Sequence, residues 1–443
     1  MDSRMGHAAN VRRLVWMAGF SATAFVMLPK GLAPFGILLA VTTCLMPLVS
    51  AANAAGKRRA LPHALGALAA MPVFVLLVCA VSMLHSGQGW GVLDNPARLL
   101  LLPWCAWLAW SSGVSRGSLW SGAMVGLALA CALAVLEHLL GAERAGGYIN
   151  PLVFAHAVMV LLVAALFCRP AMKAPVWTVL WAASVAMAVV AIVLSGSRGV
   201  IPGLVLIVIA SLLGEATGRL LWLKLGVVAG AALAVAIAFA SVPWLAEQTR
   251  MDQVWSDVAG YRHGQVDTPI GARLELLSVA AREFGDAPFT GTGIERFDAS
   301  IDASDHCRRG ERRHFCDLRH AHNDVAQWGA TMGIPGIVAI IAVYMVPLAV
   351  ALRGFRRSGY ASTRRLYLGC AALVVACLLA GMSQSTFSHA MTASSYAILA
   401  GTMLGLALRA RGGEVQKAAV SRTSRSTAPV QHPAPAWQSS RRP

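Results

Sequence analysis

The chain has 443 residues, of which 57% are hydrophobic and only 13% are charged, and its formal net charge is +17. Soluble domains carry about 25% charged residues, so this composition excludes an ordinary soluble enzyme and predicts an all-α polytopic membrane protein. The excess of Lys and Arg is explained by their gathering on one side of a membrane, and it does not indicate nucleic-acid binding.

Apolar runs separated by short polar links predict twelve transmembrane helices. The expected spans are 14–29, 35–55, 64–84, 97–112, 119–141, 149–167, 175–195, 200–213, 221–243, 333–352, 366–384 and 393–409. The first run leads straight into the second, so we expect a retained helix and not a cleaved leader. One long polar segment, about 244–332, interrupts the series between the ninth and tenth spans.

Lys and Arg gather at alternate ends of these spans, for example at Arg12, Lys57, Arg169 and Arg356. This bias predicts that both termini are cytoplasmic and that the long polar segment lies on the opposite side. The expected divisions are 1–243 with nine spans, 244–332 as the extracytoplasmic segment, 333–409 with three spans, and 410–443 as a disordered basic tail.

The end of the polar segment carries the first candidate for chemistry. Arg319-His320-Ala321-His322-Asn323 stands shortly before an apolar helix. A His at a water–membrane boundary titrates near neutral pH and can act as a base. We expect His322 to open a helix, with His320 projecting about 200° away from it. His322 is therefore the candidate base. Asn323 is interpreted as an N-cap or a substrate ligand, and His320 and Arg319 as supporting groups.

Three arginines on the outer side are candidate phosphate ligands. Arg198 lies in a Ser-Gly-Ser-Arg-Gly turn, Arg273 lies near the start of a helix-like run in the polar segment, and Arg144 precedes a Gly-Gly-Tyr stretch. A planar guanidinium matches phosphate oxygens. The alternative is that each side chain snorkels or caps a helix end.

Two of the nine cysteines, Cys307 and Cys316, lie in the polar segment, and an oxidising compartment would join them in a disulfide. A metal site with His306 and His314 is the alternative, but the spacing lacks the usual zinc-ligand pattern, so we expect no metal. Two groups of charged residues lie nearby: the acids Asp298, Asp302 and Asp305, and the bases Arg308, Arg309, Arg312 and Arg313. Both groups are interpreted as solvated surface. For the arginines, docking to a phosphorylated or acidic lipid headgroup is the alternative.

His322-Asn323, followed after nine residues by Gly333-Ile334-Pro335-Gly336, resembles the H-N-x9-G-x-x-G signature of O-antigen ligases. These enzymes belong to a wider group with O-antigen polymerases and bacterial protein O-oligosaccharyltransferases. The stretches 94–98, 195–199 and 286–293 are also similar to that group. The resemblance covers roughly residues 10–410.

The resemblance implies a GT-C-like glycosyltransferase of the bacterial inner membrane, with short helices in one large periplasmic loop. It would move a glycan from undecaprenyl pyrophosphate to a sugar hydroxyl of lipid A–core, with inversion and without a metal or cofactor. His322 would be the base, and Arg198, Arg273 and Arg144 would hold the pyrophosphate. Partners would be these two lipid-linked substrates and the surrounding membrane lipid.

Other readings remain open at this point. The enzyme could instead be an O-antigen polymerase or a protein O-oligosaccharyltransferase, each of which uses a different acceptor. Relatives often carry Glu where this chain has Met332, which favours a ligase. A lipid-linked glycan transporter is a further alternative, but we detect no inverted repeat.

Overall fold

The computed structural model describes residues 2–52, 62–112, 114–170, 174–214, 253–308 and 314–426, together with 222, 225, 226, 229 and 230. Regular structure within these residues is helical throughout. The long helices of the bundle are α1 (Asp2–Ala24), α2 (Ala33–Ala52), α3 (His63–Ser86), α5 (Leu101–Ser112), α6 (Arg116–Leu139), α7 (Pro151–Phe167), α8 (Ala174–Leu194), α9 (Ile201–Leu213), α16 (Asp324–Arg357), α17 (Ala361–Gly381) and α18 (Ala390–Ser426). Shorter elements join them: η1 (Trp90–Leu93), α4 (Asp94–Ala97), η2 (Arg98–Leu100), η3 (Arg198–Val200), α12 (Gln253–Arg262), α13 (Pro269–Asp286), α14 (Phe297–Asp302), α15 (Asp305–Arg308), η4 (His314–Asp317) and η5 (Thr386–Ser388).

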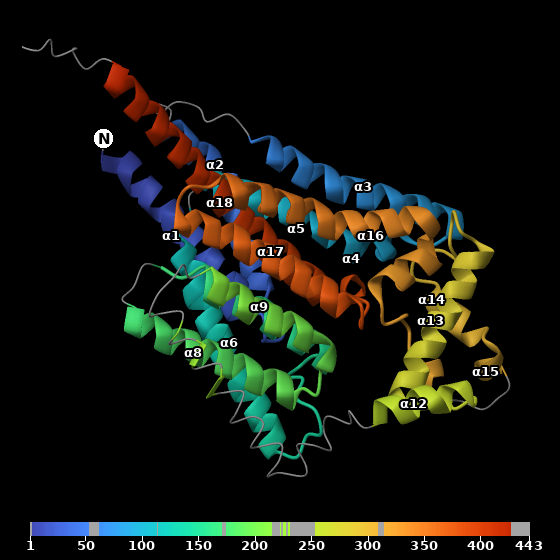
Figure 1. Cartoon of the computed structure of the whole chain (residues 1–443). Coiled ribbons are helices and arrows are strands. Elements are labelled where there is room, and N and C mark those ends of the chain that lie inside the picture. The colour runs from blue at the N-terminus through green and yellow to red at the C-terminus, as the bar shows by residue number, and fades with distance from the viewer. Residues whose placement is uncertain are drawn as a thin grey trace, which may run out of the picture.

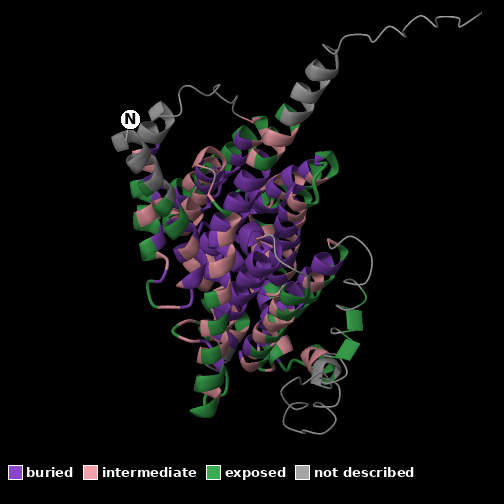
Figure 2. Ribbon diagram, turned by 90° about the vertical axis from the view of Figure 1, so that its left-hand side faces the viewer, coloured by how far each residue is buried: buried purple, intermediate pink, exposed green. Residues whose placement is uncertain are grey.

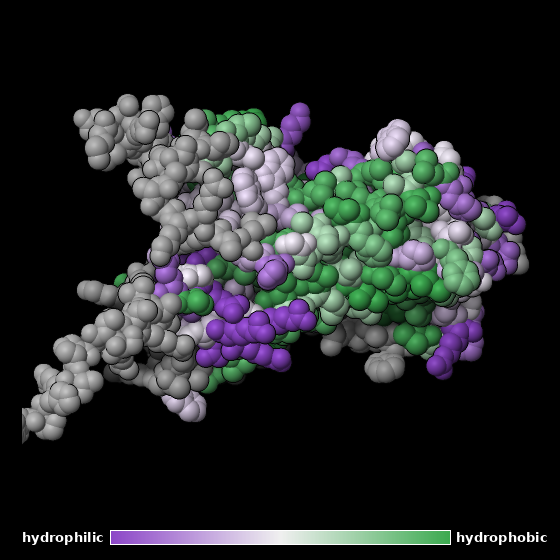
Figure 3. All heavy atoms as spheres, turned by 90° about the horizontal axis from the view of Figure 1, so that it is seen from above, coloured by the Kyte–Doolittle hydropathy of each residue, from purple (hydrophilic) through white to green (hydrophobic). Residues whose placement is uncertain are grey.

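Six described helices, α3, α6, α8, α16, α17 and α18, are long and apolar enough to cross a membrane. Three shorter apolar helices are the first part of α2 (Ala33–Met46), α7, and η3 with α9 (Arg198–Leu213). Figure 3 shows apolar atoms across the middle of one face and hydrophilic atoms toward both ends. These features support the polytopic membrane class. The predicted span 221–243 lies almost wholly outside the described residues, so the count of twelve and the GT-C-like arrangement stay predictions.

The core of the bundle is α7. Apart from His156, the residues from Val153 to Phe167 are apolar around the whole circumference, and every one of them is buried, as expected for a helix without a polar face. Helices α6, α8, α17 and α18 surround it, and Figure 2 shows this buried centre in purple.

Helices α18 and α5 also approach each other closely: a Cβ on Gly401 or Gly405 would lie 2.2 Å from a backbone oxygen of α5. Small residues four apart allow such contact.

The described part of the polar segment, α12 to α15, lies at one end of the bundle, opposite the N-terminus and the far end of α18 (Figure 1). This placement agrees with a chain whose termini share one side of a membrane, although the sidedness itself stays a prediction. Helix α18 runs to Ser426, so residues 410–426 are helical where the sequence predicted a disordered tail. Residues 427–443 lie outside the described part.

Helix α16 begins at Asp324, earlier than the predicted span, and is broken at Gly333. Gly333 has φ 63° and ψ −152°, a conformation that is essentially restricted to glycine. Its missing Cβ leaves room for the loop 288–293, since an added Cβ would lie 2.5 Å from the Pro288 oxygen. The Gly-x-Pro-Gly motif therefore encodes a break in the helix.

Backbone groups released by this break bond to the same loop. The Ile334 N–H donates to the Pro288 oxygen at 2.7 Å, and the oxygens of Ala330 and Thr331 accept from Thr292 and Gly293, each at 2.9 Å. Pro335 has no N–H with which to occupy the Thr331 oxygen. Buried backbone groups need partners, so the loop and the break satisfy each other and fix α13 against α16.

We predict that Gly333→Ala lowers the stability of the protein by about 1–3 kcal/mol, because the left-handed conformation becomes strained and the new Cβ overlaps the Pro288 carbonyl. Thermal unfolding in detergent would measure this change. Gly285→Ala is the matched control, since it lies in α13 and its added Cβ meets nothing within 4 Å. Equal melting temperatures for the two variants would contradict the role given to Gly333.

Candidate active site

The stretch 319–323 turns the chain from η4 into α16 and faces η5, the short connection between α17 and α18. Asn323 is the N-cap of α16: its Oδ1 accepts from the Ala326 N–H at 3.0 Å. Its Nδ2 donates to the Met382 oxygen at 3.1 Å, so the same side chain joins α16 to the end of α17. Of the two roles considered for Asn323, the structure supports the N-cap.

Asp324, which the sequence did not single out, fixes the start of α16. The carboxylate is 1% exposed. It accepts from the Tyr344 hydroxyl at 2.6 Å and from the Phe387 N–H at 3.4 Å. A Cβ on Gly381 would overlap it at 2.4 Å, so a glycine on α17 makes room for the acid. Its only sequence signal was that it is the sole acid between Asn323 and Gly333.

His322 does not open the helix, contrary to the prediction. It precedes α16 and has φ 51°, a left-handed conformation that is uncommon for any residue with a side chain. The break in regular structure explains the error: Asn323 caps the helix, so the residue before the cap is free of helical geometry. The projection of about 200° between His320 and His322 on a helix therefore does not apply.

The ring of His322 is half-buried, and among the described residues its buried Nδ1 has no hydrogen-bond partner. Burial and the positive charge of Arg273, with smaller effects from His320 and His389, lower its pKa to about 4. The ring is therefore neutral at pH 7 and can accept a proton.

His320 lies against His389 of the η5 connection, with ring centroids 5.5 Å apart and planes at 81°. Burial lowers the pKa of His320 to about 4, with His389 and Arg319 adding to the shift and Asp298 opposing it. Burial also lowers the pKa of His389. The structure thus brings both histidines of the stretch to one region and adds His389.

The three predicted arginines come together. Burial lowers the pKa of the Arg273 guanidinium, and the positive charges of Arg144 and Arg198 lower it further. The side chains of all three keep exposed surface. Three like charges at short range repel one another, and a bound anion would offset that repulsion. Since Arg273 also acts on His322, the histidine lies beside a cationic region.

Backbone turns hold two of these arginines in place. The Arg144 Nε donates to the Ser195 oxygen at 3.0 Å, and Gly196, at φ 62°, comes close enough that a Cβ would lie 3.2 Å from that nitrogen. Gly199, beside Arg198, has no room for a Cβ because Ser383 fills the space. The Ser-Gly-Ser-Arg-Gly turn therefore packs against both Arg144 and the end of α17.

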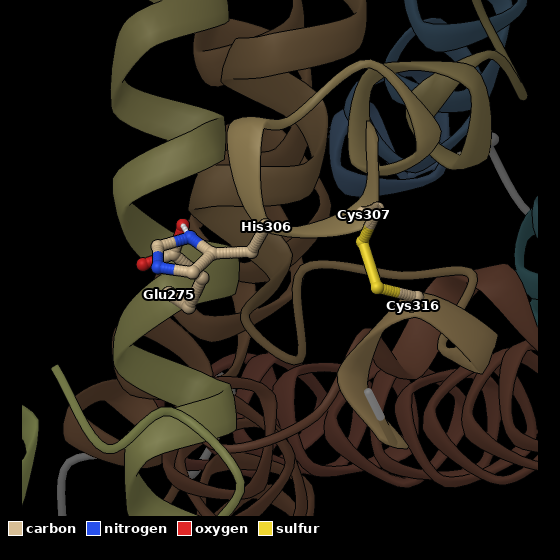
Figure 4. The surroundings of a disulfide bond; sticks show 4 residues. All are labelled: Glu275, His306, Cys307 and Cys316. Atoms are coloured by element: carbon tan, nitrogen blue, oxygen red, sulfur yellow. Dashed lines mark ion pairs between the residues drawn. A yellow bond between two sulfur atoms is a disulfide. The ribbon is translucent and has the colours of Figure 1, made fainter. Parts of the chain in front are cut away.

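Figure 4 shows how the polar segment is tied to α13. Cys307 and Cys316 form a disulfide, as the sequence predicted. Next to it, the His306 Nδ1 lies 3.3 Å from the Glu275 Oε1, and Glu275 also accepts from the Tyr261 hydroxyl at 3.1 Å. Glu275 is two residues from Arg273, so this brace fixes the helix that carries the arginine.

Of the basic cluster in the loop between these cysteines, only Arg308 is described. Arg309, Arg312 and Arg313 lie outside the described residues. In the part of the chain that the structure describes, no three His, Cys, Asp or Glu side chains gather in a manner that could hold a metal ion.

A cavity of about 290 Å³ lies beside the stretch, between α3, η1 and α4 on one side and the residues around α14 and α16 on the other. Arg319 and His320 line it together with Asn95, Glu295 and Asp298. Asp298 is half-buried and lines this cavity, whereas Asp302 and Asp305 are exposed, as expected for a solvated surface.

Residues 182–341 match a protein-family model described as "O-Antigen ligase". This segment runs from α8 into α16 and contains Arg198, Arg273 and His322, whereas Arg144 precedes it. No curated protein matched the chain.

The low pKa of His322 can be measured by NMR of the histidine ring nitrogens, with the His322→Gln spectrum assigning the signal. We expect a midpoint at about 4, so the ring stays neutral as pH falls from 7 to 5. Arg273→Gln should raise the midpoint, because protonation no longer meets a nearby positive charge. Arg273→Lys keeps the charge and should leave the midpoint low. A wild-type midpoint near 6.5 would contradict this electrostatic account.

Proposed function

We propose that the chain transfers a glycan from undecaprenyl pyrophosphate to a sugar hydroxyl of lipid A–core, on the premise of the match between residues 182–341 and the O-antigen ligase family model. The observation that carries the proposal is the position of His322 next to Arg273, which in turn lies close to Arg144 and Arg198. A base and a cationic anion site, side by side at the polar end of a membrane bundle, suit glycosyl transfer from a lipid diphosphate.

The arginines are proposed to hold the pyrophosphate of the donor. Their planar forks can each bind two phosphate oxygens, and the leaving group gains negative charge as the glycosidic bond breaks. Cations positioned at that charge stabilise the transition state. The donor is already activated, so the reaction requires neither ATP nor a nucleotide sugar, and no cofactor is assigned to it.

His322 is proposed as the general base. The acceptor oxygen attacks the anomeric carbon, the bond from that carbon to the pyrophosphate oxygen breaks, and the acceptor proton passes to His322. Undecaprenyl pyrophosphate leaves with the bonding electron pair. Attack opposite the leaving group inverts the anomeric centre.

Donor binding also strengthens this base. A histidine with a pKa of about 4 is a weak proton acceptor, since general bases work best when their pKa lies near the operating pH. Pyrophosphate bound at the arginines brings negative charge close to Arg273, whose positive charge lowers this pKa, so the pKa rises once the donor is bound. His322 is therefore the stronger base when the lipid-linked donor is bound.

The proposed location is the bacterial inner membrane, with both termini in the cytoplasm and the site on the periplasmic face. The opposite placement of the termini and of α12 to α15 (Figure 1) supports this orientation. The Lys and Arg bias of the sequence gives independent support.

The first test is in vitro transfer by the purified full chain, with undecaprenyl-pyrophosphate glycan, lipid A–core and EDTA. We expect wild-type product with an inverted anomeric linkage by NMR, and a loss of about 10²–10⁴-fold in His322→Ala. His263→Ala, in an exposed turn after α12, is the control and should retain activity.

Each outcome of this assay bears on one part of the proposal. Full activity in His322→Ala would remove the base. A retained linkage would contradict direct attack. Lengthened lipid-linked glycan or a glycosylated protein, without product on lipid A–core, would identify a polymerase or a protein-linked transferase and overturn the acceptor. A donor that only crosses the membrane would identify a transporter.

A second test concerns the arginines. Arg198→Gln and Arg273→Gln should each lower kcat/KM for the donor by roughly 10- to 100-fold, since each removes a charged hydrogen-bond donor. Lysine at the same positions should restore part of the loss, because it keeps the charge without the planar fork. Arg262→Gln, an exposed position on α12, is the matched control. Unchanged rates in both glutamine variants would contradict pyrophosphate binding here.

A further inference from the structure

The two histidines of the stretch 319–323 have different charged neighbours. Arg273 is the charge that most affects His322, and it belongs to the group of three arginines. His320 is affected by the positive charges of His389 and Arg319 and by the opposing charge of Asp298, and the neighbouring cavity is lined by Glu295 and Asp298. One turn of chain therefore separates the group of arginines from a cavity that contains two acids.

The cavity has the size and lining of a ligand site. Its volume of about 290 Å³ lies at the lower end of the range of about 300–1,000 Å³ found for ligand pockets, which combine apolar walls with a few polar groups. The apolar walls include Phe297, Trp328 and Met332. The polar groups are Asn95, Glu295, Asp298, Arg319, His320, Gln327, Thr331 and Ser388.

The backbone presents Glu295 in a constrained way. Its φ is 56°, and of the three non-glycine residues with positive φ in the described part of the chain, two are Glu295 and His322. The Ile294 N–H donates to the Ser82 Oγ at 3.0 Å, and the Arg296 N–H donates to the Gly293 oxygen at 3.2 Å. Strain held by such bonds is concentrated at functional sites.

The charge of the cavity restricts its ligand. Carboxylates accept hydrogen bonds from hydroxyl groups and repel phosphate. Asp94 adds a third acid nearby: burial raises the pKa of Glu295, and the charges of Asp298 and Asp94 raise it further. Arg98 is paired with Asp94 at 2.6 Å, which leaves Arg319 as the cation that lines the cavity.

We propose that this cavity binds an unphosphorylated sugar residue of the acceptor, with Glu295 and Asp298 as positioning residues that accept hydrogen bonds from its hydroxyl groups. The inference rests on the proposed function and deepens it, because it assigns the acceptor to the acidic side of the stretch and the donor pyrophosphate to the cationic side. Ala321, which is buried and donates its N–H to the Gln327 Oε1 at 2.7 Å, separates the two histidines and fixes the boundary.

The test compares Glu295→Gln and Asp298→Asn with Asp302→Asn in the full chain. Both cavity variants keep the size of the side chain and lose its charge, so each should raise KM for lipid A–core about tenfold or more while KM for the lipid-linked donor and the melting temperature stay constant. Asp302→Asn is the matched control, because Asp302 is an exposed residue of the same helix, α14, and should leave both KM values unchanged.

A binding measurement separates this inference from the proposed function. His322→Ala, which should not turn over, is titrated with core oligosaccharide that has been chemically dephosphorylated. We expect binding that is weakened about tenfold by Glu295→Gln or Asp298→Asn in the same background. Loss of binding on dephosphorylation, an increase in donor KM instead of acceptor KM, or equal binding by the cavity variants would overturn the inference. Wild-type protein that binds the core but transfers nothing would instead overturn the function.

Discussion

The pairing of the broken helix α16 with the loop 288–293 is the constraint on which the site depends. Gly333 interrupts α16, and the backbone groups released on either side bond to Pro288, Thr292 and Gly293. This contact joins the helix that follows His322 to the helix that carries Arg273. Together with the buried apolar cluster that contains Leu276 and Ala280 of α13 and Ala330 of α16, it fixes two segments that are separated in sequence by about fifty residues, so that His322 and Arg273 share one geometry.

Charge is distributed around this junction in two halves. The arginines lie on one side of the stretch 319–323, and the acids of the cavity lie on the other. Because the interior of a protein screens charge weakly, the two sides present different charges to a bound ligand. A diphosphate and a hydroxyl-rich sugar would therefore be sorted by electrostatics before any specific contact forms.

Much of this could be predicted from the sequence. Apolar runs located the helices, the lone pair of cysteines in the polar segment predicted the disulfide, and the four residues Arg144, Arg198, Arg273 and His322 gather in the structure. Tertiary features could not be predicted in the same way. Asp324 meets Tyr344 and Phe387 only after three elements have packed, and the cavity combines Asn95 with Glu295, which are two hundred residues apart. The helix position assigned to His322 was wrong because the N-cap role that the sequence suggested for Asn323 places the preceding residue outside the helix.

The break at Gly333 also changes how the motif that begins at His322 can be understood. Its two ends have different roles: the histidine belongs to the proposed chemistry, whereas Gly333 forms a backbone joint. The hydrogen bonds of that joint are mainly between main-chain N–H and C=O groups, with added bonds from the hydroxyls of Thr292 and Ser82. The side chains of Phe289, Thr290 and Ile334 make none of these bonds, whereas any Cβ at Gly333 would overlap the loop. The scaffold can therefore accept wide variation in the surface that meets a glycan while the distance between base and arginines is preserved, which is the property that a transferase for many different polymers would need.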